Sequence, residues 1–370
     1  MKILHLLSYH LYTGPAEPVL RLARAQRRLG HDARLAIDRY RPGDLAGRAA
    51  DYQVPLVAGL ALSVKAGPLA QLSDMVRLRR LLKREWHVVH CHRTHDHVMA
   101  TLAAAGRRGP LLLRTVHAAR SLVAGRGWLL RRADGVITIC RQHRQQILRR
   151  GWQPDCRVLA IEGVVEPEDL MPADGDLRRE LGVRPDAPLA GMVARMKPGR
   201  GHELLLSAWR RVAHGNPRAR LLLAGRGEEE HHLRALVAGD ELLAGSVVFA
   251  GYRRDLGRLY RTLDLKVILA PGNDGTCRAA LEAMACGVPV LAPAVDALAE
   301  IVEDNHTGRL LEAARPELLA EAILDLLGDR GRLRALGRNA AERARERFTM
   351  DRQVAEIMDF IERLQKPKRQ

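Results

Sequence analysis

The sequence predicts an α/β fold with two domains, each built on a parallel sheet. Short apolar runs typical of strands alternate with amphipathic stretches typical of helices, and this order indicates parallel strands joined by helices. At 370 residues the chain exceeds the size at which one core usually keeps growing, and 47% of its residues are hydrophobic. Among the expected strands are residues 2–7, 87–90, 111–115, 135–139, 188–193, 220–224 and 247–250.

The first strand leads into the first candidate site. Residues 2–7 form an apolar run, a loop follows, and an amphipathic helix is expected over residues 19–29, closed by Gly30. Ligands of α/β proteins usually bind at loops that follow the carboxyl ends of strands. Gly14 lies in this loop and lets a backbone approach a ligand closely, whereas Pro15 has no N–H to donate. Gly14 is therefore a candidate ligand-binding residue.

The next helix is basic and amphipathic. Over residues 69–86 the apolar positions are interleaved with five Arg and Lys residues before residue 85. Such a helix either contacts a membrane surface or packs against the sheet with its charges in water. We expect the packing role, and the membrane contact remains the alternative. The apolar positions are Leu72, Met75, Val76, Leu78, Leu81 and Leu82.

Histidines gather where two neighbouring strands end. Five of the eleven residues from His87 to His97 are histidine, which suggests a metal site. Nothing nearby resembles a zinc-protease or cysteine-rich motif, however, so no metal is expected. The strand over residues 111–115 leads to another histidine, His117, at the mouth of the predicted sheet.

The most informative segment begins at Asp274. An apolar run, a Pro-Gly break and helical periodicity follow one another here, so the order is strand, loop, helix, with Asp274 in the loop and Glu282 in the helix. The first amides of a helix carry the positive end of its dipole. Gly275, Thr276 and Cys277 are therefore expected to present N–H groups to a phosphate. An ordinary strand-to-helix crossover capped by Asp274 is the alternative.

This segment resembles the donor site of retaining glycosyltransferases of family 4 (glycosyl transferases group 1). Their signature is Glu, seven residues, Glu, then Ala-Met-Ala-Cys-Gly-x-Pro-Val, and this chain has Asp274 in the first Glu position. The resemblance implies that Asp274 contacts the hydroxyls of the transferred sugar and that Glu282 contacts the ribose of the nucleotide. It further implies a GT-B fold, with two Rossmann-like domains facing each other across a deep cleft.

The same resemblance implies roles for basic residues elsewhere. Arg195 and Arg200 match the pair that binds the donor diphosphate, and guanidinium groups suit phosphate oxygens. His117 matches a histidine beside the transferred sugar and the acceptor, and His92 is placed at the acceptor cleft. The expected catalytic residues are His117, Asp274, Arg195 and Arg200. The expected donor-binding residues are Gly14, Arg195, Arg200, Gly275, Thr276, Cys277 and Glu282.

The resemblance also implies the domain organisation. Residues 1–165 are expected to form an acceptor-binding domain, residues 166–187 a linker, and residues 188–348 the domain that binds the nucleotide sugar. Residues 349–370 are expected to form a helix that crosses back to the first domain, followed by a basic tail.

The net charge of +17 is uneven. Residues 1–170 hold 28 Lys and Arg against 14 Asp and Glu, whereas the remainder holds 32 against 29. The first half is therefore expected either to meet an anionic partner, such as a phosphorylated glycolipid or a phospholipid surface, or to present a solvated charged face. Nucleic acid is not expected, because four Trp, six Tyr and three Phe offer few stacking surfaces.

Cysteine usage and hydropathy predict the location. The five cysteines are odd in number and scattered, as in a reducing compartment. No charged leader with a cleavage site is evident, and no apolar run reaches about 18 residues. The expected location is the cytoplasm or the inner face of the cytoplasmic membrane.

The expected function is transfer of a sugar from a UDP-, GDP- or ADP-sugar, with retention of configuration and without a metal or other cofactor. The expected acceptor is an anionic glycan or a lipid-linked precursor in cell-envelope polysaccharide or lipopolysaccharide synthesis. Two alternatives share the GT-B architecture: a nucleotide-sugar 2-epimerase, and a non-catalytic scaffold that binds a nucleotide sugar. Pro15, Asp274 and the Thr276-Cys277 pair depart from the family pattern and keep the scaffold open as an alternative.

Overall fold

The computed structural model describes most of the chain as two compact units. Unit 1 comprises Met1–Gly163, Asn273–Gly275 and Met350–Gln370, and unit 2 comprises Val164–Gly272 and Thr276–Thr349. The side chains of residues 120 and 274–276 are not described, and the candidate Gly14 lies outside the described residues. The described ranges are residues 1–12, 15–83, 86–106, 109–123, 125, 127–166, 170, 175–272, 274–313 and 315–366.

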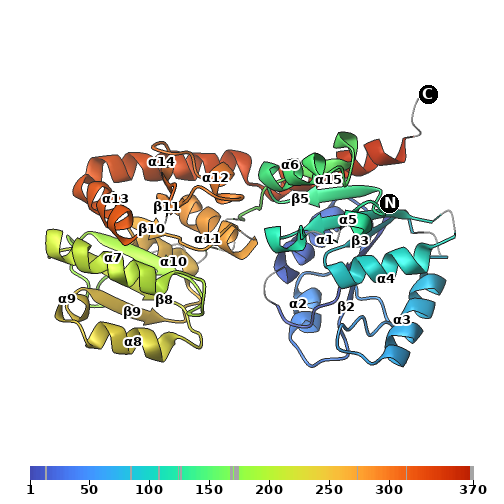
Figure 1. Ribbon diagram of the computed structural model, residues 1–370, viewed down its shortest axis with the longest axis horizontal. Coiled ribbons are helices and arrows are strands. Elements are labelled where there is room, and N and C mark those ends of the chain that lie inside the picture. Colours follow the sequence, from blue (N-terminus) through green and yellow to red (C-terminus); the bar gives the residue numbers. More distant parts are fainter. Residues whose placement is uncertain are drawn as a thin grey trace. The chain divides into compact units, whose positions relative to one another are not determined.

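Each unit contains a six-stranded parallel sheet with helices on both faces (Figure 1). Parallel strands require long crossover connections, and the amphipathic stretches of the sequence supply them. The expected α/β class with parallel sheets is therefore confirmed.

The sheet of unit 1 has the order β2-β1-β3-β4-β5-β6. Its strands are β1 (Lys2–Leu7), β2 (Asp32–Ile37), β3 (Val88–Cys91), β4 (Leu111–Val116), β5 (Gly135–Thr138) and β6 (Val158–Ala160). Its helices are α1 (Ala16–Arg28), α2 (Leu45–Asp51), α3 (Pro68–Leu81), α4 (Thr94–Ala104), α5 (Gly127–Leu130), α6 (Arg141–Arg149) and α15 (Met350–Gln365).

The two faces of this sheet differ in polarity because successive strand residues point to opposite faces. Leu4 and Leu6 of β1 join Val89 and Cys91 of β3 in an apolar core that also includes residues of α3 and α4. On the opposite face, His5 of β1 pairs in register with His90 of β3. The histidines therefore share a face, and helices α1 and α15 contribute the side chains described below.

Helix α15 completes unit 1 although it lies at the C-terminal end of the chain. It packs against α1, and it also covers the start of β5. A Cβ added at Gly135 would lie 2.5 Å from Leu364 Cδ1 and 3.1 Å from Phe360 Cε1, so these side chains of α15 pack directly on the glycine. The expected return of the last helix to the first half of the chain is confirmed.

The sheet of unit 2 has the order β12-β11-β10-β7-β8-β9. Its strands are β7 (Leu189–Val193), β8 (Arg220–Ala224), β9 (Val247–Gly251), β10 (Leu265–Val267), β11 (Val290–Pro293) and β12 (Gly308–Leu311). Its helices are α7 (His202–Gly215), α8 (Glu230–Ala238), α9 (Glu241–Ala244), α10 (Leu256–Thr262), α11 (Asp274–Ala285), α12 (Leu298–Ile301), α13 (Pro316–Gly328) and α14 (Arg330–Arg347).

Strand order reverses once in each unit. In unit 2 the chain runs outward from β7 to β8 and β9, then returns to place β10 on the other side of β7. In unit 1 the corresponding reversal separates β1 from β3. Loops at such switch points diverge, and ligands of open α/β sheets bind there. The candidate residues fall at these two places.

Two predicted element boundaries are wrong. The basic helix expected over residues 69–86 ends at Leu81, and part of its predicted apolar face is in water. Asp274 was expected in a loop, but α11 begins at this residue. Helix ends are weakly encoded, because the first turn makes no internal hydrogen bonds through its amides.

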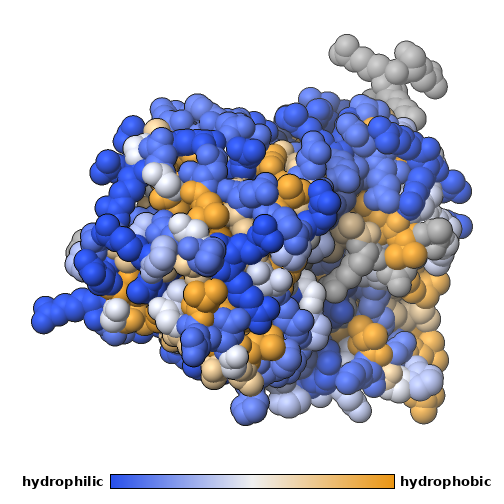
Figure 2. Space-filling model, turned by 60° about the vertical axis from the view of Figure 1, so that its left-hand side comes forward, coloured by the Kyte–Doolittle hydropathy of each residue, from blue (hydrophilic) through white to orange (hydrophobic). Residues whose placement is uncertain are grey.

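The exposed surface is mainly polar. On the face drawn in Figure 2, hydrophilic side chains cover most of the area and apolar ones stand in small groups. Within the described residues, every helix is too short or too polar to span a bilayer.

Candidate functional site

The loop that follows β7 carries the two candidate arginines of unit 2. Two backbone hydrogen bonds tie its first residues to the segment after β8: Ala194 N–H to Ala224 O (3.0 Å) and Met196 N–H to Arg226 O (3.1 Å). Between them Arg195 projects into solvent, whereas Arg200 near the end of the loop is half-buried. The loop is thus fixed by its backbone and leaves the Arg195 side chain open to a ligand.

A Gly-x-Gly turn after β8 supports this loop. A Cβ at Gly225 would lie 2.0 Å from Ala194 O, and one at Gly227 would lie 2.0 Å from Met196 O. Gly225 also has φ of +140°, a conformation that side chains disfavour. The two glycines therefore allow the turn to press directly against the backbone on both sides of Arg195.

The two arginines interact electrostatically. Burial lowers the pKa of Arg200, and the nearby charge of Arg195 lowers it further. The next helix, α7, starts two residues later at His202, and the N-terminus of a helix is electropositive. Burial also lowers the pKa of His202 to about 4, with Lys266 and Arg200 acting in the same direction. An anion would relieve this concentration of positive charge.

Glu282 is held in a fixed orientation on α11. Its side chain is buried, Oε2 accepts a hydrogen bond from Tyr260 Oη at 2.8 Å, and Oε1 accepts one from Arg278 Nε at 2.7 Å. A carboxylate oxygen has two lone pairs, so each oxygen retains one for a ligand hydroxyl. Burial raises the pKa of Tyr260, and the Glu282 charge raises it further, so the phenol remains a donor.

Lys266 of β10 is a polar residue of this region that the sequence reasoning missed. Its side chain is 1% exposed, and Nζ donates to Val193 O, at the end of β7, at 3.1 Å. Burial lowers its pKa to about 7, against the opposing effect of the Glu282 charge. A lysine inside the apolar run of β10 was the signal that could have revealed it. Tyr260 and Arg278, the partners of Glu282, carried no comparable signal.

The start of α11 contains four further candidates. Asp274, Gly275, Thr276 and Cys277 form its first turn, whose amides face the N-terminal end of the helix. The side chain of Cys277 is 3% exposed, so it packs inward. For the other three, the structure describes the helical backbone alone.

The two histidine candidates of unit 1 are in contact. His117, half-buried after β4, lies with Nε2 3.3 Å from Nδ1 of His92. The side chain of His92, the residue expected at the acceptor cleft, is 3% exposed and lies against His117. His92 follows β3, an interior strand of the sheet, and His117 takes the more exposed position.

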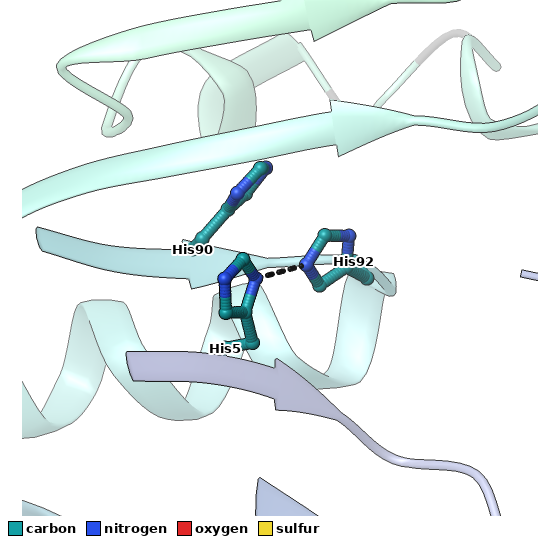
Figure 3. Close-up of side chains that lie close together, drawn as sticks. All are labelled: His5, His90 and His92. Atoms are coloured by element: carbon teal, nitrogen blue, oxygen red, sulfur yellow. Dashed lines mark hydrogen bonds between the residues drawn. The ribbon is translucent and has the colours of Figure 1, made fainter. Parts of the chain in front are cut away.

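Beneath His92 lie two histidines that the sequence reasoning did not select. His5 of β1 points toward His92, and His90 of the neighbouring strand β3 lies next to both (Figure 3). Each of the three offers a ring nitrogen within 4.8 Å of the others, and all three are buried. His90 Nε2 lies 2.6 Å from Thr115 Oγ1. These three buried imidazoles lie at the switch point of unit 1 and form a second cluster of polar groups, after the one in unit 2.

Buried histidines make the stability of unit 1 depend on pH. Burial lowers the pKa of His97 to about 3, and Arg114 acts in the same direction. Burial lowers the pKa of His5 to about 4, against the hydrogen bond to Gln26. Between the ordinary value of 6.5 and these values, the unfolded chain binds protons that the folded chain does not. Stability is therefore present above pH 6.5 and is lost as pH falls toward 4.

We expect each of these two histidines to reduce the free energy of unfolding by up to ~1.4 kcal/mol per pH unit below pH 6.5. Urea unfolding of unit 1, followed by circular dichroism at several pH values from 7 to 5, measures this slope. His97→Leu removes one of the two groups and should give a shallower slope than the wild-type protein. Equal slopes for both proteins would show that His97 remains able to bind its proton in the folded state.

Fold and site geometry together define the class of the protein. Residues 13–161 match the family model of the glycosyl transferase 4-like domain, and residues 174–343 match the model of glycosyl transferases group 1. Two Rossmann-like units with these matches give the chain the architecture of the GT-B glycosyltransferases. It belongs to the glycosyl transferases group 1, the family that its donor-site segment resembles.

Relatives of similar sequence bear the names of glycosyltransferases. Over 300 residues the chain is 29% identical to the D-inositol 3-phosphate glycosyltransferase of Salinispora tropica, a match covering 75% of this chain and 60% of that protein. Over 315 residues it is 27% identical to LpsB of Rhizobium meliloti, a lipopolysaccharide core biosynthesis mannosyltransferase, covering 81% and 86%. The chain thus spans about three fifths of the first relative and most of the second.

Solved structures share the fold. A glycosyltransferase from Rickettsia africae superposes with a TM-score of 0.81 at 18% identity, covering 99% of both chains. Anabaena HepE in complex with UDP and glucose superposes with a TM-score of 0.75 at 21% identity, covering 97% of this chain and 99% of HepE. These likenesses extend over nearly the whole chain and confirm the GT-B architecture.

Proposed function

We propose that the protein transfers a sugar from a nucleoside diphosphate sugar to a glycan or glycolipid acceptor, with retention of configuration. The observation that carries this proposal is the arrangement at the switch point of unit 2. There Arg195 and Arg200 follow β7, the oriented carboxylate of Glu282 belongs to α11, and Lys266 links β10 to the end of β7. Cationic and carboxylate groups are what a diphosphate and a ribose require.

The proposed roles follow from charge. As the bond to the sugar breaks, negative charge develops on the leaving diphosphate, and guanidinium groups held nearby stabilise it more than they stabilise the ground state. Arg195 and Arg200 take this part, together with the electropositive first turn of α11. Glu282 binds the ribose hydroxyls, and Asp274 positions the transferred sugar. In this proposal the positive charge of the protein stabilises the leaving diphosphate, and no divalent ion is needed.

The donor base, the sugar and the acceptor belong to the same proposal. UDP is favoured among the nucleotides because HepE, a structural neighbour, is seen with UDP. The acceptor is proposed to be an anionic glycan or lipid-linked precursor of the cell envelope, since LpsB acts in lipopolysaccharide core synthesis and the first half of this chain is basic. The proposed location is the cytoplasm or the inner face of the cytoplasmic membrane.

A screen of UDP-, GDP- and ADP-sugars tests binding and chemistry together. Thermal shift reports binding, nucleotide release reports turnover, and the anomeric coupling in the product spectrum reports retention. We expect one nucleotide to raise the melting temperature and to be released from its sugar. Isomerisation of donor alone would instead identify a 2-epimerase, and binding without release with any acceptor would identify a scaffold. Failure of every donor to bind would overturn the proposal.

An exposed stripe on α3 favours contact with a membrane. Leu69, Leu72 and Val76 are 84%, 53% and 41% exposed, and Arg77 and Arg80 line the same shallow groove. Apolar side chains beside cations suit the boundary of an anionic bilayer, where both find partners. We propose that this stripe places the enzyme beside a lipid-linked acceptor.

Leu72→Glu is therefore expected to weaken binding to vesicles that contain phosphatidylglycerol by about tenfold or more, since burying a leucine contributes roughly 1.5–3 kcal/mol. Vesicle sedimentation measures the bound fraction. Leu242→Glu on α9 is the matched control, because Leu242 is similarly exposed at 46% but belongs to unit 2. The two variants should differ. Equal binding by both would remove α3 from the proposed contact.

A further inference from the structure

Four side chains of unit 1 form a continuous chain of hydrogen bonds. His117 Nε2 lies 3.3 Å from His92 Nδ1, His92 Nε2 lies 3.0 Å from His5 Nδ1, and His5 Nε2 lies 2.8 Å from Gln26 Oε1. The chain starts at the half-buried His117 after β4 and ends at Gln26, a buried residue of α1. Both ring nitrogens of His92 and of His5 are engaged.

Gln26, at the inner end of the chain, fixes which ring nitrogen of His5 carries the proton. Gln26 turns its Nε2 toward the sulfur of Met358 on α15 at 3.7 Å and its Oε1 toward His5. This orientation gives the amide nitrogen an acceptor and the amide oxygen a donor, whereas the flipped amide would set its oxygen against the electron-rich sulfur. His5 therefore carries its proton on Nε2 and has a lone pair on Nδ1.

The remaining protons follow in order because a neutral imidazole carries only one. His5 Nδ1 accepts, so His92 must donate from Nε2. His92 Nδ1 is then an acceptor, so His117 must donate from Nε2. The rings of His5 and His92 are neutral because burial disfavours their charged forms and lowers both pKa values, His5 to about 4.

We propose that Gln26, His5 and His92 position His117 through this one-way chain of hydrogen bonds, which holds the His117 ring with its proton on Nε2 and its lone pair on Nδ1. The three are positioning residues, since their contacts reach His117 and not a ligand. His90 lies outside the chain and bonds to Thr115 instead.

The chain gives His117 a defined chemical polarity. With a lone pair on Nδ1, the neutral ring can accept a hydrogen bond at that atom but cannot donate one from it. This consequence rests on the proposed function, in which His117 faces the transferred sugar or the acceptor. The tautomer itself does not depend on that function, so the two statements can fail separately.

Nitrogen NMR of the whole protein, labelled with 15N in its histidine rings, tests the tautomer directly. Ring nitrogens with a proton and with a lone pair resonate far apart, and the spectrum of His117→Gln identifies the signals of His117. For the neutral His117 ring we expect the Nε2–H tautomer alone. A neutral His117 ring that is mainly Nδ1–H would overturn the proposal.

A variant at Gln26, the inner end of the chain, tests whether it determines the tautomer of His117. Gln26→Leu removes the anchor and keeps an apolar contact for Met358, and it should give His117 signals averaged between the two tautomers. His97→Leu is the matched control, because His97 is a buried histidine of the same unit whose described ring atoms make no hydrogen bond. It should leave the His117 signals in place. Unchanged His117 signals in the Gln26 variant would contradict transmission.

Two further measurements complete the test. If His117 acts on the sugar, Gln26→Leu should lower kcat several-fold with little change in the KM for the donor, and His97→Leu should change neither. Zinc bound tightly at one equivalent per chain, detected by elemental analysis of protein prepared without a metal column, would overturn the chain. A metal on His5 Nδ1 and His92 Nε2 would replace the proton that those atoms share.

Discussion

Replacing Arg195 by alanine is expected to lower the turnover of the nucleoside diphosphate sugar about 10²–10³-fold, the usual effect of removing one fixed donor from developing negative charge. The Arg195 side chain is exposed, so the chain should remain folded. Steady-state release of nucleotide measures the loss, and circular dichroism confirms the fold. Because the interaction strengthens in the transition state, kcat should fall more than KM rises.

Two further variants make this result specific to Arg195. Arg211→Ala removes an equally exposed charge from α7 and should leave turnover unchanged. Arg195→Lys keeps the charge but loses the planar fork that matches phosphate oxygens, so it should restore only part of the rate. A folded Arg195→Ala protein with wild-type turnover would exclude Arg195 from the donor site.

Gly225→Ala is expected to cost unit 2 at least about 2 kcal/mol of unfolding free energy and several degrees of melting temperature. The added Cβ would lie 2.0 Å from Ala194 O, so the turn and the loop before Arg195 must separate. Donor KM should rise as well, because the backbone that holds Arg195 moves. Thermal unfolding and donor saturation kinetics measure the two effects.

Gly328→Ala provides the comparison for this variant. Gly328 ends α13, and a Cβ added there would meet no atom within 4 Å. Its melting temperature should be equal to or higher than that of the wild-type protein, because alanine favours the helix, and its donor KM should be unchanged. If Gly225→Ala also matched the wild-type protein, the turn after β8 would not support the Arg195 loop.

The fold was predictable from the sequence because strand and helix periodicity are local. Residues 2–7 and 220–224 form strands with the predicted bounds. The end of the basic helix was not predictable in this way, because α3 stops at Leu81 inside a run that still alternates apolar and basic residues. Tertiary packing, which engages Leu78 but leaves Leu72 in water, decides that boundary.

The candidate site was predictable only where a motif marks it. Glu282 and Arg195 stand in recognisable patterns, whereas Tyr260, the partner of Glu282, stands twenty-two residues away without any pattern. The hydrogen-bonded histidine chain could not be predicted for a similar reason. His5 and His92 are 87 residues apart, and only the register between β1 and β3 brings them together. Contacts made by topology cannot be read from spacing.

The position of α15 imposes an order on biosynthesis. Gln26 and Met358 are 332 residues apart in sequence, yet they touch inside the same unit. During translation, the first 163 residues leave the ribosome long before the helix that covers their sheet. Unit 2 can be folded by then, while unit 1 still lacks the helix that covers one face of its sheet, so side chains that are later buried stay open to chaperones or other chains. The half of the protein made first is therefore the half that finishes last.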